Sequence, residues 1–409
     1  MIKIAFVSPG KLPQPAIKGG AVEGLIDLLV DSLKIEYNKY DVHVYSVGER
    51  DEDTVIENVN YHYIKNTGAL NQISRKTRGI INILSKNLYI GNNYINKVAQ
   101  RIKAQRMAFD IVIAQNVPEY GIILKKYNVA KHYILHMHNN NFNNGSKNAK
   151  EIFDIYEEIY TISNTVKQYI CSINNSDKVK VLYNGVDQSI FGKRISAEER
   201  RAERSKLNFE PDDVVFVFAG RLTQEKGVKE LILAFKQLVQ KNKNAKLMII
   251  GSSFFDGAKD TEYVTELKKI AETIKNNIVF TGFIKHENLY KWYQLGDVGV
   301  VPSQWDEPFA LTVIEEMMCG LPMIASKCGG IVEITQEDCA ILIEQNSEYV
   351  NNLAKAMQDL LDDPIRRETM SDNAVEQAGK FDSRRYCCTF KKYIDNVTNM
   401  DQRKREKGC

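Results

Sequence analysis

Short runs of hydrophobic residues alternate along the chain with longer segments in which hydrophobic positions recur about every 3.6 residues. Most short runs are continuous in Val, Ile and Leu, which is typical of strands covered on both faces. The longer segments have the period of amphipathic helices, for example Val228–Val239, Leu289–Leu295 and Leu311–Met318. This alternation predicts an α/β fold with parallel sheets.

The expected strands form two groups. In the first half of the chain they are Lys3–Val7, Asp41–Val47, Asp110–Ala114, His132–His136, Ile159–Ile162 and Lys178–Leu182. In the second half they are Val214–Ala219, Lys246–Gly251, Asn277–Thr281, Asp297–Val301 and Pro322–Ala325. A turn at Asn184-Gly185 and a charged helical stretch separate the groups, which predicts a domain boundary near Asp187. The length of 409 residues also favours two domains.

Composition excludes several classes of protein. Hydrophobic residues make up 44% of the chain and charged residues 26%, which excludes disorder, collagen and a disulfide-stapled miniprotein. Since the chain has no apolar run of about eighteen residues, we expect no transmembrane helix. The start, MIKIAFVSPG, is typical of a buried strand rather than a signal peptide. The seven cysteines contain no C-x-x-C pair, so we expect reduced thiols in a cytoplasmic protein.

The charge of the first half is one-sided. The segment from Asn58 to Phe109 has no acidic residue and nine basic ones: Lys65, Arg75, Lys76, Arg78, Lys86, Lys97, Arg101, Lys103 and Arg106. Gln72–Ile90 predicts a helix with an apolar stripe opposite basic residues. It fits an ordinary surface helix packed on the core, or peripheral contact of 65–106 with an anionic membrane. Nucleic acid is not expected, because stacking aromatic residues and a binding-module pattern are absent.

The segment EPFALTVIE carries candidate chemistry in the second half. A buried strand ends at Val301 and a helix is expected to begin near Ala310, with Glu307 before it and Glu315 inside it. The backbone amides near the helix start form an anion site that the helix dipole reinforces. A diphosphate between two carboxylates that accept hydrogen bonds from diols suits a nucleotide sugar. The alternative is an ordinary acidic helix start.

The segment FAGRLTQEKG adds two cations, Arg221 and Lys226, to the loop after another buried strand. Arg offers a bidentate fork for phosphate oxygens, and Lys a point charge. Alone, the pair could be two surface cations. Because both loops leave the same edge of one parallel sheet, we expect the cations and the amides to share a diphosphate.

Loops of the first half offer weaker signals. Gly19-Gly20 precedes a helix and would let backbone approach a ligand, or would form a flexible turn, but it lacks the dinucleotide-binding glycine pattern. His136 and His138 lie at the end of a strand, where either could be an ordinary strand-end histidine. The D-x-D sequence at Asp51–Asp53 is expected to be a solvated loop, so no metal site is predicted.

Together these segments resemble the family-4 retaining glycosyltransferases, which have the GT-B fold. The resemblance rests on FAGRLTQEKG, EPFALTVIE, VLYNGVDQSIF at the domain junction, Gly19-Gly20 and GGIVEI from Gly329, and it covers nearly the whole chain. It implies two Rossmann-like doubly wound domains facing a central cleft. Residues 1–187 would form the acceptor-side domain, joined by a C-terminal crossover helix at about 382–409, and 188–381 the nucleotide-sugar-binding domain.

The resemblance also implies a role for each matching residue. Arg221 and Lys226 would hold the donor diphosphate, Glu307 the hydroxyls of the transferred sugar, and Glu315 the ribose diol. His138, with His136 as second choice, would approach the transferred sugar. The remaining donor-binding residues would be Gly19, Gly20, Phe309, Ala310, Leu311, Thr312, Gly251, Phe283 and Ile284. Many relatives have Gly where this chain has Ala310.

The expected activity follows from the resemblance. The chain would transfer a hexose-type sugar from a UDP-, GDP- or dTDP-sugar to a saccharide, with retention and without a metal or other cofactor. The acceptor would be polyprenyl-linked, in surface or capsular polysaccharide assembly at the inner face of the cell membrane. The alternatives are a glycosyltransferase of the same fold with a soluble acceptor, and a non-catalytic nucleotide-sugar-binding protein.

Overall fold

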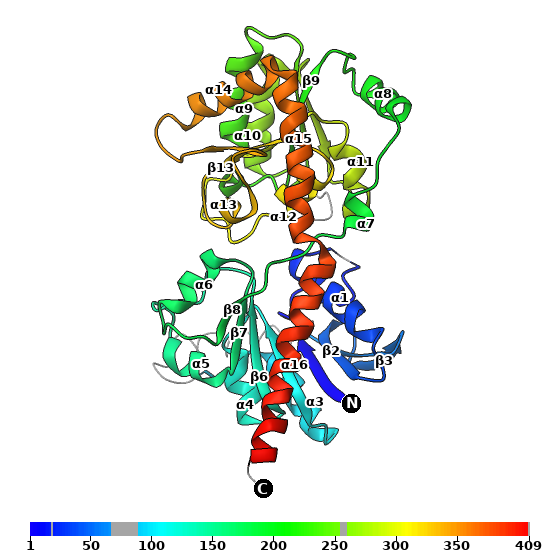
Figure 1. Ribbon diagram of the computed structural model, residues 1–409, viewed down its shortest axis with the longest axis vertical. Coiled ribbons are helices and arrows are strands. Elements are labelled where there is room, and N and C mark those ends of the chain that lie inside the picture. Colours follow the sequence, from blue (N-terminus) through cyan, green and yellow to red (C-terminus); the bar gives the residue numbers. More distant parts are fainter. Residues whose placement is uncertain (18, 67–88, 254–259, 408–409) are drawn as a thin grey trace. The chain divides into compact units, whose positions relative to one another are not determined.

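The computed structural model describes residues 1–17, 19–66, 89–253 and 260–407 of the chain, which divide into two units (Figure 1). The first unit consists of Met1–Tyr183 and Tyr386–Cys409, and the second of Asn184–Arg385. The chain thus leaves the first unit once and returns to it in its last helix.

The first unit contains an eight-stranded sheet in the order β3-β4-β2-β1-β5-β6-β7-β8. The strands are β1 (Ile2–Val7), β2 (Tyr40–Gly48), β3 (Glu52–Ile56), β4 (Val59–Lys65), β5 (Phe109–Gln115), β6 (Ala130–Met137), β7 (Glu158–Thr161) and β8 (Val179–Val181). Every strand expected in this half is present. The strands pair in parallel, except that β3 runs antiparallel to β4 at the edge.

The sequence analysis expects Asp51–Asp53 to be a solvated loop. Asp51 and Asp53 are exposed, as expected, but Glu52 and Asp53 belong to the strand β3 rather than to a loop. Asp53 lies in β3, where its carboxylate accepts hydrogen bonds from His62 and pairs with Arg101. Glu57 and Asn58 join the strands with positive φ angles of 47° and 67°, as a tight hairpin turn requires. The sequence of β3 is EDTVI, which begins with two acidic residues and lacks the continuous apolar run of a central strand.

Helices pack against this sheet: α1 (Ala21–Lys34), α3 (Asn93–Ala104), α4 (Tyr120–Lys126), α5 (Ala149–Ile155), α6 (Asn164–Cys171) and the last helix α16 (Ser383–Lys407). Phe390 of α16 lies 5.9 Å from Phe6, centroid to centroid, which anchors this helix on the sheet. The expected helix Gln72–Ile90 falls almost wholly outside the described residues. Of the basic residues that are described, Arg101 donates to Tyr63 O and Lys97 to Lys65 O.

The second unit contains a six-stranded parallel sheet in the order β11-β10-β9-β12-β13-β14. Its strands are β9 (Val214–Ala219), β10 (Ala245–Ile250), β11 (Ile278–Gly282), β12 (Val298–Val301), β13 (Met323–Ser326) and β14 (Ala340–Ile343). Its helices are α7 (Gln188–Phe191), α8 (Ala197–Lys206), α9 (Val228–Val239), α10 (Glu262–Ala271), α11 (Leu289–Tyr293), α12 (Leu311–Met318), α13 (Ile331–Ile334), α14 (Tyr349–Asp362) and α15 (Pro364–Ala378). The expected strands and helices are present, and the short strand β14 is an addition.

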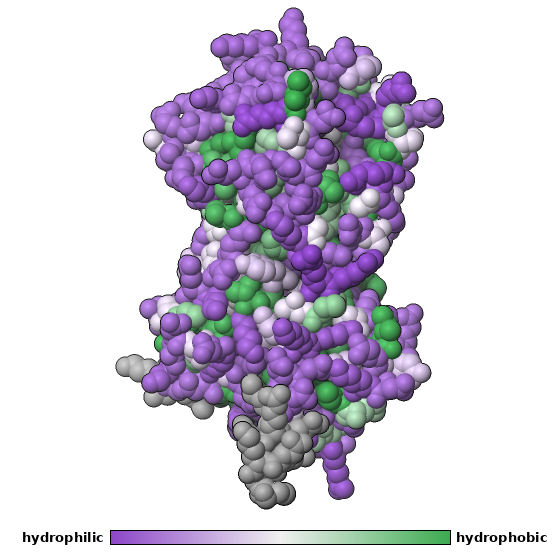
Figure 2. All heavy atoms as spheres, viewed as in Figure 1, coloured by the Kyte–Doolittle hydropathy of each residue, from purple (hydrophilic) through white to green (hydrophobic). Residues whose placement is uncertain are grey.

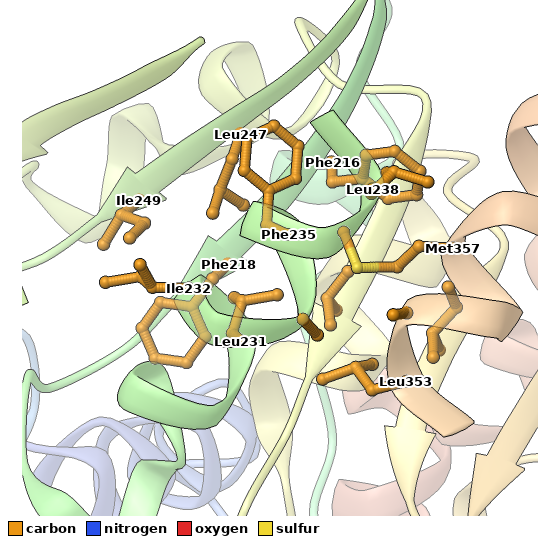
Figure 3. Packing of buried hydrophobic residues seen from close by; sticks show 14 of the residues in the cluster. Phe216, Phe218, Leu231, Ile232, Phe235, Leu238, Leu247, Ile249, Leu353 and Met357 are labelled. Carbon is orange, nitrogen blue, oxygen red and sulfur yellow. The ribbon is translucent and has the colours of Figure 1, made fainter. Parts of the chain in front are cut away.

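The core of the second unit explains its continuous hydrophobic strands. Phe216 and Phe218 of β9 pack with Phe235 of α9 and Met357 of α14 on one face of the sheet (Figure 3). The intervening Val217 is equally buried and faces the other side. Each such side chain contributes about 1.5–3 kcal/mol by leaving water. Because these strands are packed on both faces, their ends have fixed positions. The first residues of the loops that follow them are therefore fixed as well.

The surface is polar on the face drawn in Figure 2, where hydrophobic residues lie in small groups. Among the described residues, no helix is both long enough and apolar enough to cross a membrane. The six cysteines within the described residues are free thiols, and Cys319, Cys328, Cys339 and Cys387 are buried.

Candidate active site

Two loops leave the carboxyl ends of the neighbouring strands β9 and β12 and pack backbone against backbone. Gln304 N, after β12, donates to Glu225 O, after β9, at 2.8 Å. Gly227 has a φ of 69°, and a Cβ there would overlap the carbonyl oxygen of Pro302. Only glycine satisfies both conditions, so Gly227 fixes the distance between the loops.

Lys226 and Glu307 form an ion pair between these two loops. The Glu307 side chain is 4% exposed and that of Lys226 is 20% exposed, so the carboxylate depends on this cation for compensation. Lys226 Nζ also lies 5.7 Å from the centroid of the Trp305 ring. Gly330 N donates to Glu307 O at 2.7 Å, which holds the loop from its other side. The structure thus brings together two residues that sequence reasoning places in the site.

Arg221 lies in the same loop as Lys226 and is more accessible. Its guanidinium is 3.5 Å from Glu225 Oε1, and its side chain is 49% exposed. Although burial opposes the shift, hydrogen bonds to the carboxylate and the charges of Arg221 and Lys226 lower the pKa of Glu225. Glu225 therefore stays ionised between the two cations.

Helix α12 begins beside Glu307 without a side-chain cap. Ala310 is its N-cap residue and makes no side-chain cap hydrogen bond. The ring of Phe309 packs edge-on against Phe381 at 6.0 Å, so Phe309 presents its backbone rather than its side chain. The amides of Leu311 and Thr312 belong to the first turn, where the helix dipole favours an anion.

Glu315 lies one turn inside α12 and receives a hydrogen bond on each carboxylate oxygen. Tyr293 OH donates to Oε2 at 2.9 Å, and His286 Nε2 lies 2.8 Å from Oε1. The hydrogen bond to Glu315 and its negative charge raise the pKa of His286. Sequence reasoning missed both partners. His286 follows β11, so the rule that ligands gather beyond strand ends could have found it.

The residues expected near the nucleotide base follow β10 and β11. Gly251 has a φ of 134°, a Cβ there would overlap Gly220 O, and its N–H donates to Gly282 O at 2.9 Å. Phe283 is 44% exposed, and Ile284 is half-buried. An accessible aromatic side chain beside closely packed backbone is a suitable surface for a base to stack on.

Gly19 and Gly20 precede α1 in the first unit, with φ angles of 75° and 107°. A Cβ at Gly19 would meet nothing within 4 Å, whereas one at Gly20 would overlap Glu23. Both positions therefore require glycine for their backbone, and Gly19 has open space beside it.

His136 and His138 are both buried, at 0% and 9% exposure, with ring centroids 4.2 Å apart. His138 Nε2 pairs with Gln115 Oε1 at 2.9 Å, while neither ring nitrogen of His136 has a partner among the described residues. Burial lowers the pKa of His138 to about 3 and that of His136 well below its ordinary value. Both rings are therefore neutral at physiological pH, and the role of His138 at the sugar stays a prediction.

In the described residues, no group of three or more His, Cys, Asp or Glu side chains is arranged to hold a metal ion. The site instead combines two cations, two carboxylates and an uncapped helix N-terminus at neighbouring strand ends. This combination can bind an anionic phosphate together with hydroxyl groups.

Comparison with known proteins identifies the kind of enzyme. Residues 199–377, which contain this whole arrangement, match the family model Glycosyl transferases group 1, so this part of the chain is similar to that family. The protein is a glycosyltransferase. It is 28% identical over 382 residues to YtcC of Bacillus subtilis (strain 168), covering 91% of this chain and 86% of that protein. It is also 28% identical over 387 residues to spore coat protein SA of the same strain, covering 92% and 94%.

Solved structures place this glycosyltransferase in the GT-B fold. The crystal structure of Anabaena HepE in complex with UDP and glucose matches with a TM-score of 0.72 and 19% identity, covering 97% of this chain and 100% of that one. At that identity the likeness establishes the fold. The two α/β units with parallel sheets therefore confirm the fold class expected from the sequence.

Proposed function

We propose that this glycosyltransferase moves a hexose-type sugar from a nucleoside diphosphate sugar to a saccharide, with retention and without a metal. The observation that carries the proposal is the Lys226–Glu307 ion pair beside the uncapped N-terminus of α12. A cation, a carboxylate and backbone amides converge there, which matches a sugar joined to a diphosphate.

Donor binding would redistribute the charges already present. The diphosphate would take Lys226, Arg221 and the first amides of α12 as ligands. As Lys226 turns toward phosphate, Glu307 gains an unoccupied oxygen that can accept hydrogen bonds from sugar hydroxyls. Glu315, deeper in α12, would accept those of the ribose diol. Each carboxylate would then hold hydroxyl groups, and each cation would hold phosphate.

Transfer would proceed by front-face displacement. The acceptor oxygen bonds to the anomeric carbon on the side from which the diphosphate leaves, and the bond from that carbon to the phosphate oxygen breaks. The acceptor proton passes to the departing phosphate oxygen, and the configuration is retained. Arg221, Lys226 and the helix amides stabilise the charge that grows on the leaving group, and one such donor is typically worth about 10²–10³ in rate.

The proposal is tested first with donors. We expect thermal stabilisation by at least one of a panel of UDP-, GDP- and dTDP-sugars, with UDP-sugars tried first because the HepE complex contains UDP. Arg221→Ala and Lys226→Ala should each lower transfer by about 10²–10³. Lys229→Ala, in an exposed pair with Glu266, is the matched control and should retain activity. Near-normal turnover of both site variants would refute the assignment.

Lys226→Ala also leaves Glu307 buried without its cation, so folding must be checked separately. The double variant Lys226→Met with Glu307→Gln removes both charges at once. It should fold with near-normal stability and remain inactive, whereas recovery of activity would show that the pair is only structural.

We further propose a lipid-linked saccharide acceptor at the inner face of the cell membrane. The nine basic residues between Asn58 and Phe109, with no acidic residue among them, support this acceptor. Arg75, Lys76 and Arg78 lie outside the described residues, whereas Lys97 and Arg101 donate to backbone within the first unit. Sedimentation with anionic vesicles should weaken when the first three are changed to Gln, and Lys97→Gln should matter less. Unchanged sedimentation would favour a soluble acceptor.

A further inference from the structure

Two side chains bind the Glu315 carboxylate, one from the protein interior and one from the accessible side. Tyr293, which is fully buried, donates to Oε2 from the protein interior. His286 binds Oε1 and is the exposed partner, because its side chain is 67% accessible while that of Glu315 is 5% accessible. The accessible approach to this carboxylate is therefore occupied by an imidazole ring.

The two partners differ in how easily they can leave. Tyr293 is fully buried, so breaking its bond to Glu315 would leave a buried donor without a partner, which is costly. His286 lies on a short 3-10 turn, His286–Asn288, soon after β11, and its ring makes an edge contact with Phe191 at 5.2 Å. Water can replace Glu315 as the partner of such an exposed ring, so its release costs little.

A vicinal diol binds a carboxylate best through both oxygens, with one hydroxyl donating to each. Tyr293 leaves lone pairs on Oε2 available, but His286 lies on the accessible side of Oε1. We propose that His286 is a displaceable cap on Glu315, whose imidazole covers the carboxylate in the empty enzyme and leaves when the ribose diol of a nucleotide sugar binds. This inference rests on the proposed role of Glu315 in the donor site.

The charges around His286 give the cap a pH dependence. Glu315 is the charged group in contact with His286, and Tyr293 of α11 shares that carboxylate. Lys285 and Glu287 flank His286 in the chain, while Glu316 and Arg194 act on Cys319, further along α12. Glu315 dominates, since it raises the pKa of His286 through a direct hydrogen bond. An imidazolium at low pH competes with the ribose more strongly than a neutral ring does. Donor affinity should therefore rise as pH increases through the titration of His286.

The test measures binding of UDP-glucose and GDP-mannose to the whole protein by calorimetry, at about pH 6 and about pH 8, on either side of the ordinary pKa of His. The phosphates of these probes are diesters and stay ionised at both values. The wild type should bind more weakly at the lower pH. At the lower pH, His286→Ala should bind the probes up to about tenfold more tightly than the wild type. Its affinity for them should be nearly independent of pH.

Two controls make the result specific. Lys291→Ala, on the neighbouring α11, removes an exposed charge without touching Glu315 and should keep the pH dependence of the wild type. The 2′,3′-dideoxy form of the better probe cannot offer a diol, so His286→Ala should give it no advantage.

The possible failures are distinguishable. If His286→Ala binds more weakly than the wild type at both pH values, His286 supports the donor and the cap is refuted, while the proposed function stands. If Glu315→Gln binds donors as tightly as the wild type, or if the wild type binds no member of the panel of UDP-, GDP- and dTDP-sugars, the assignment of the donor site fails and the cap fails with it.

Discussion

The candidate residues of the two units differ in charge. In the second unit, Lys226 and Glu307 form an ion pair, and Arg221 lies in the same loop as Lys226. In the first unit, His136 and His138 are buried and neutral, because burial lowers their pKa values. A charged site suits an anionic ligand, whereas neutral imidazoles suit uncharged hydroxyl groups. The difference teaches that, under the proposed function, the diphosphate and the sugar would rely on different electrostatics in the two units.

The largest effect should come from breaking the backbone contact that assembles the charged site. Gly227→Ala requires a residue with a Cβ at a φ of 69° and overlaps Pro302 O, so the loop must shift. A displacement of about 1 Å can cost about 10² in rate, and we expect at least that loss in transfer assays. Gly379→Ala is the control, because its Cβ would meet nothing within 4 Å. Full activity of Gly227→Ala would mean that the loop contact is not needed.

The second prediction concerns Glu316, which follows Glu315 in α12. It is fully buried, its carboxylate has no hydrogen-bond partner among the described residues, and burial raises its pKa well above the ordinary value. The folded state therefore prefers the protonated acid. The protonated Glu316 contributes its full stability at pH values below the pKa that Glu has in the unfolded chain. As pH rises from there toward the higher pKa of Glu316 in the folded protein, the free energy of unfolding falls by about 1.4 kcal/mol per pH unit.

Glu316→Gln should abolish that loss and make the second unit more stable at neutral pH. Both tryptophans, Trp292 and Trp305, belong to this unit, so their fluorescence during urea unfolding reports on it alone. Glu266→Gln, at an exposed position, should leave the pH profile of the wild type unchanged. A Glu316→Gln protein that still loses stability with rising pH would show that another group titrates.

The third prediction is that the first unit loses stability at acid pH, in contrast to the second unit. Because the folded pKa values of His136 and His138 are depressed, their contribution to stability is present above about pH 6.5 and is lost as pH falls toward the folded values. His136→Asn removes one of these groups and should flatten the acid limb. Hydrogen exchange of peptides from β5 and β6 follows this unit directly. Equal acid sensitivity of wild type and variant would contradict the assignment.

The smallest effect should come from Trp305→Leu. The change removes the ring that lies 5.7 Å from Lys226 Nζ but leaves the ion pair with Glu307. A cation–π contact at an accessible site is worth about 0.5–1 kcal/mol, so we expect donor affinity to change by about two- to fivefold. Trp292→Phe is the control, and a loss as large as that of Lys226→Ala would assign Trp305 a direct role at the donor.

The sequence predicts the fold of the second unit well because its strands are covered on both faces and read as unbroken apolar runs, such as Val214–Ala219. It predicts β3 poorly because an edge strand is solvated and carries charge. Arg221, Lys226, Glu307 and Glu315 could be grouped by the rule that parallel strands end at one edge. The same rule places His286 after β11, at that edge of the sheet, but it does not show that His286 contacts Glu315, because a strand-end position leaves the direction of the side chain open.

The hairpin of β3 and β4 has a consequence for how the protein behaves at high concentration. A parallel sheet ending at β4 would offer unpaired backbone groups to another molecule. The folded-back strand Glu52–Ile56 occupies those groups, and next to it Arg50 and Glu52 form an accessible ion pair. A second chain would have to strip water from those charges to add a strand there. The hairpin thus moves the edge of the sheet to a five-residue strand that begins with charged residues, and short, charged edges disfavour pairing with another chain.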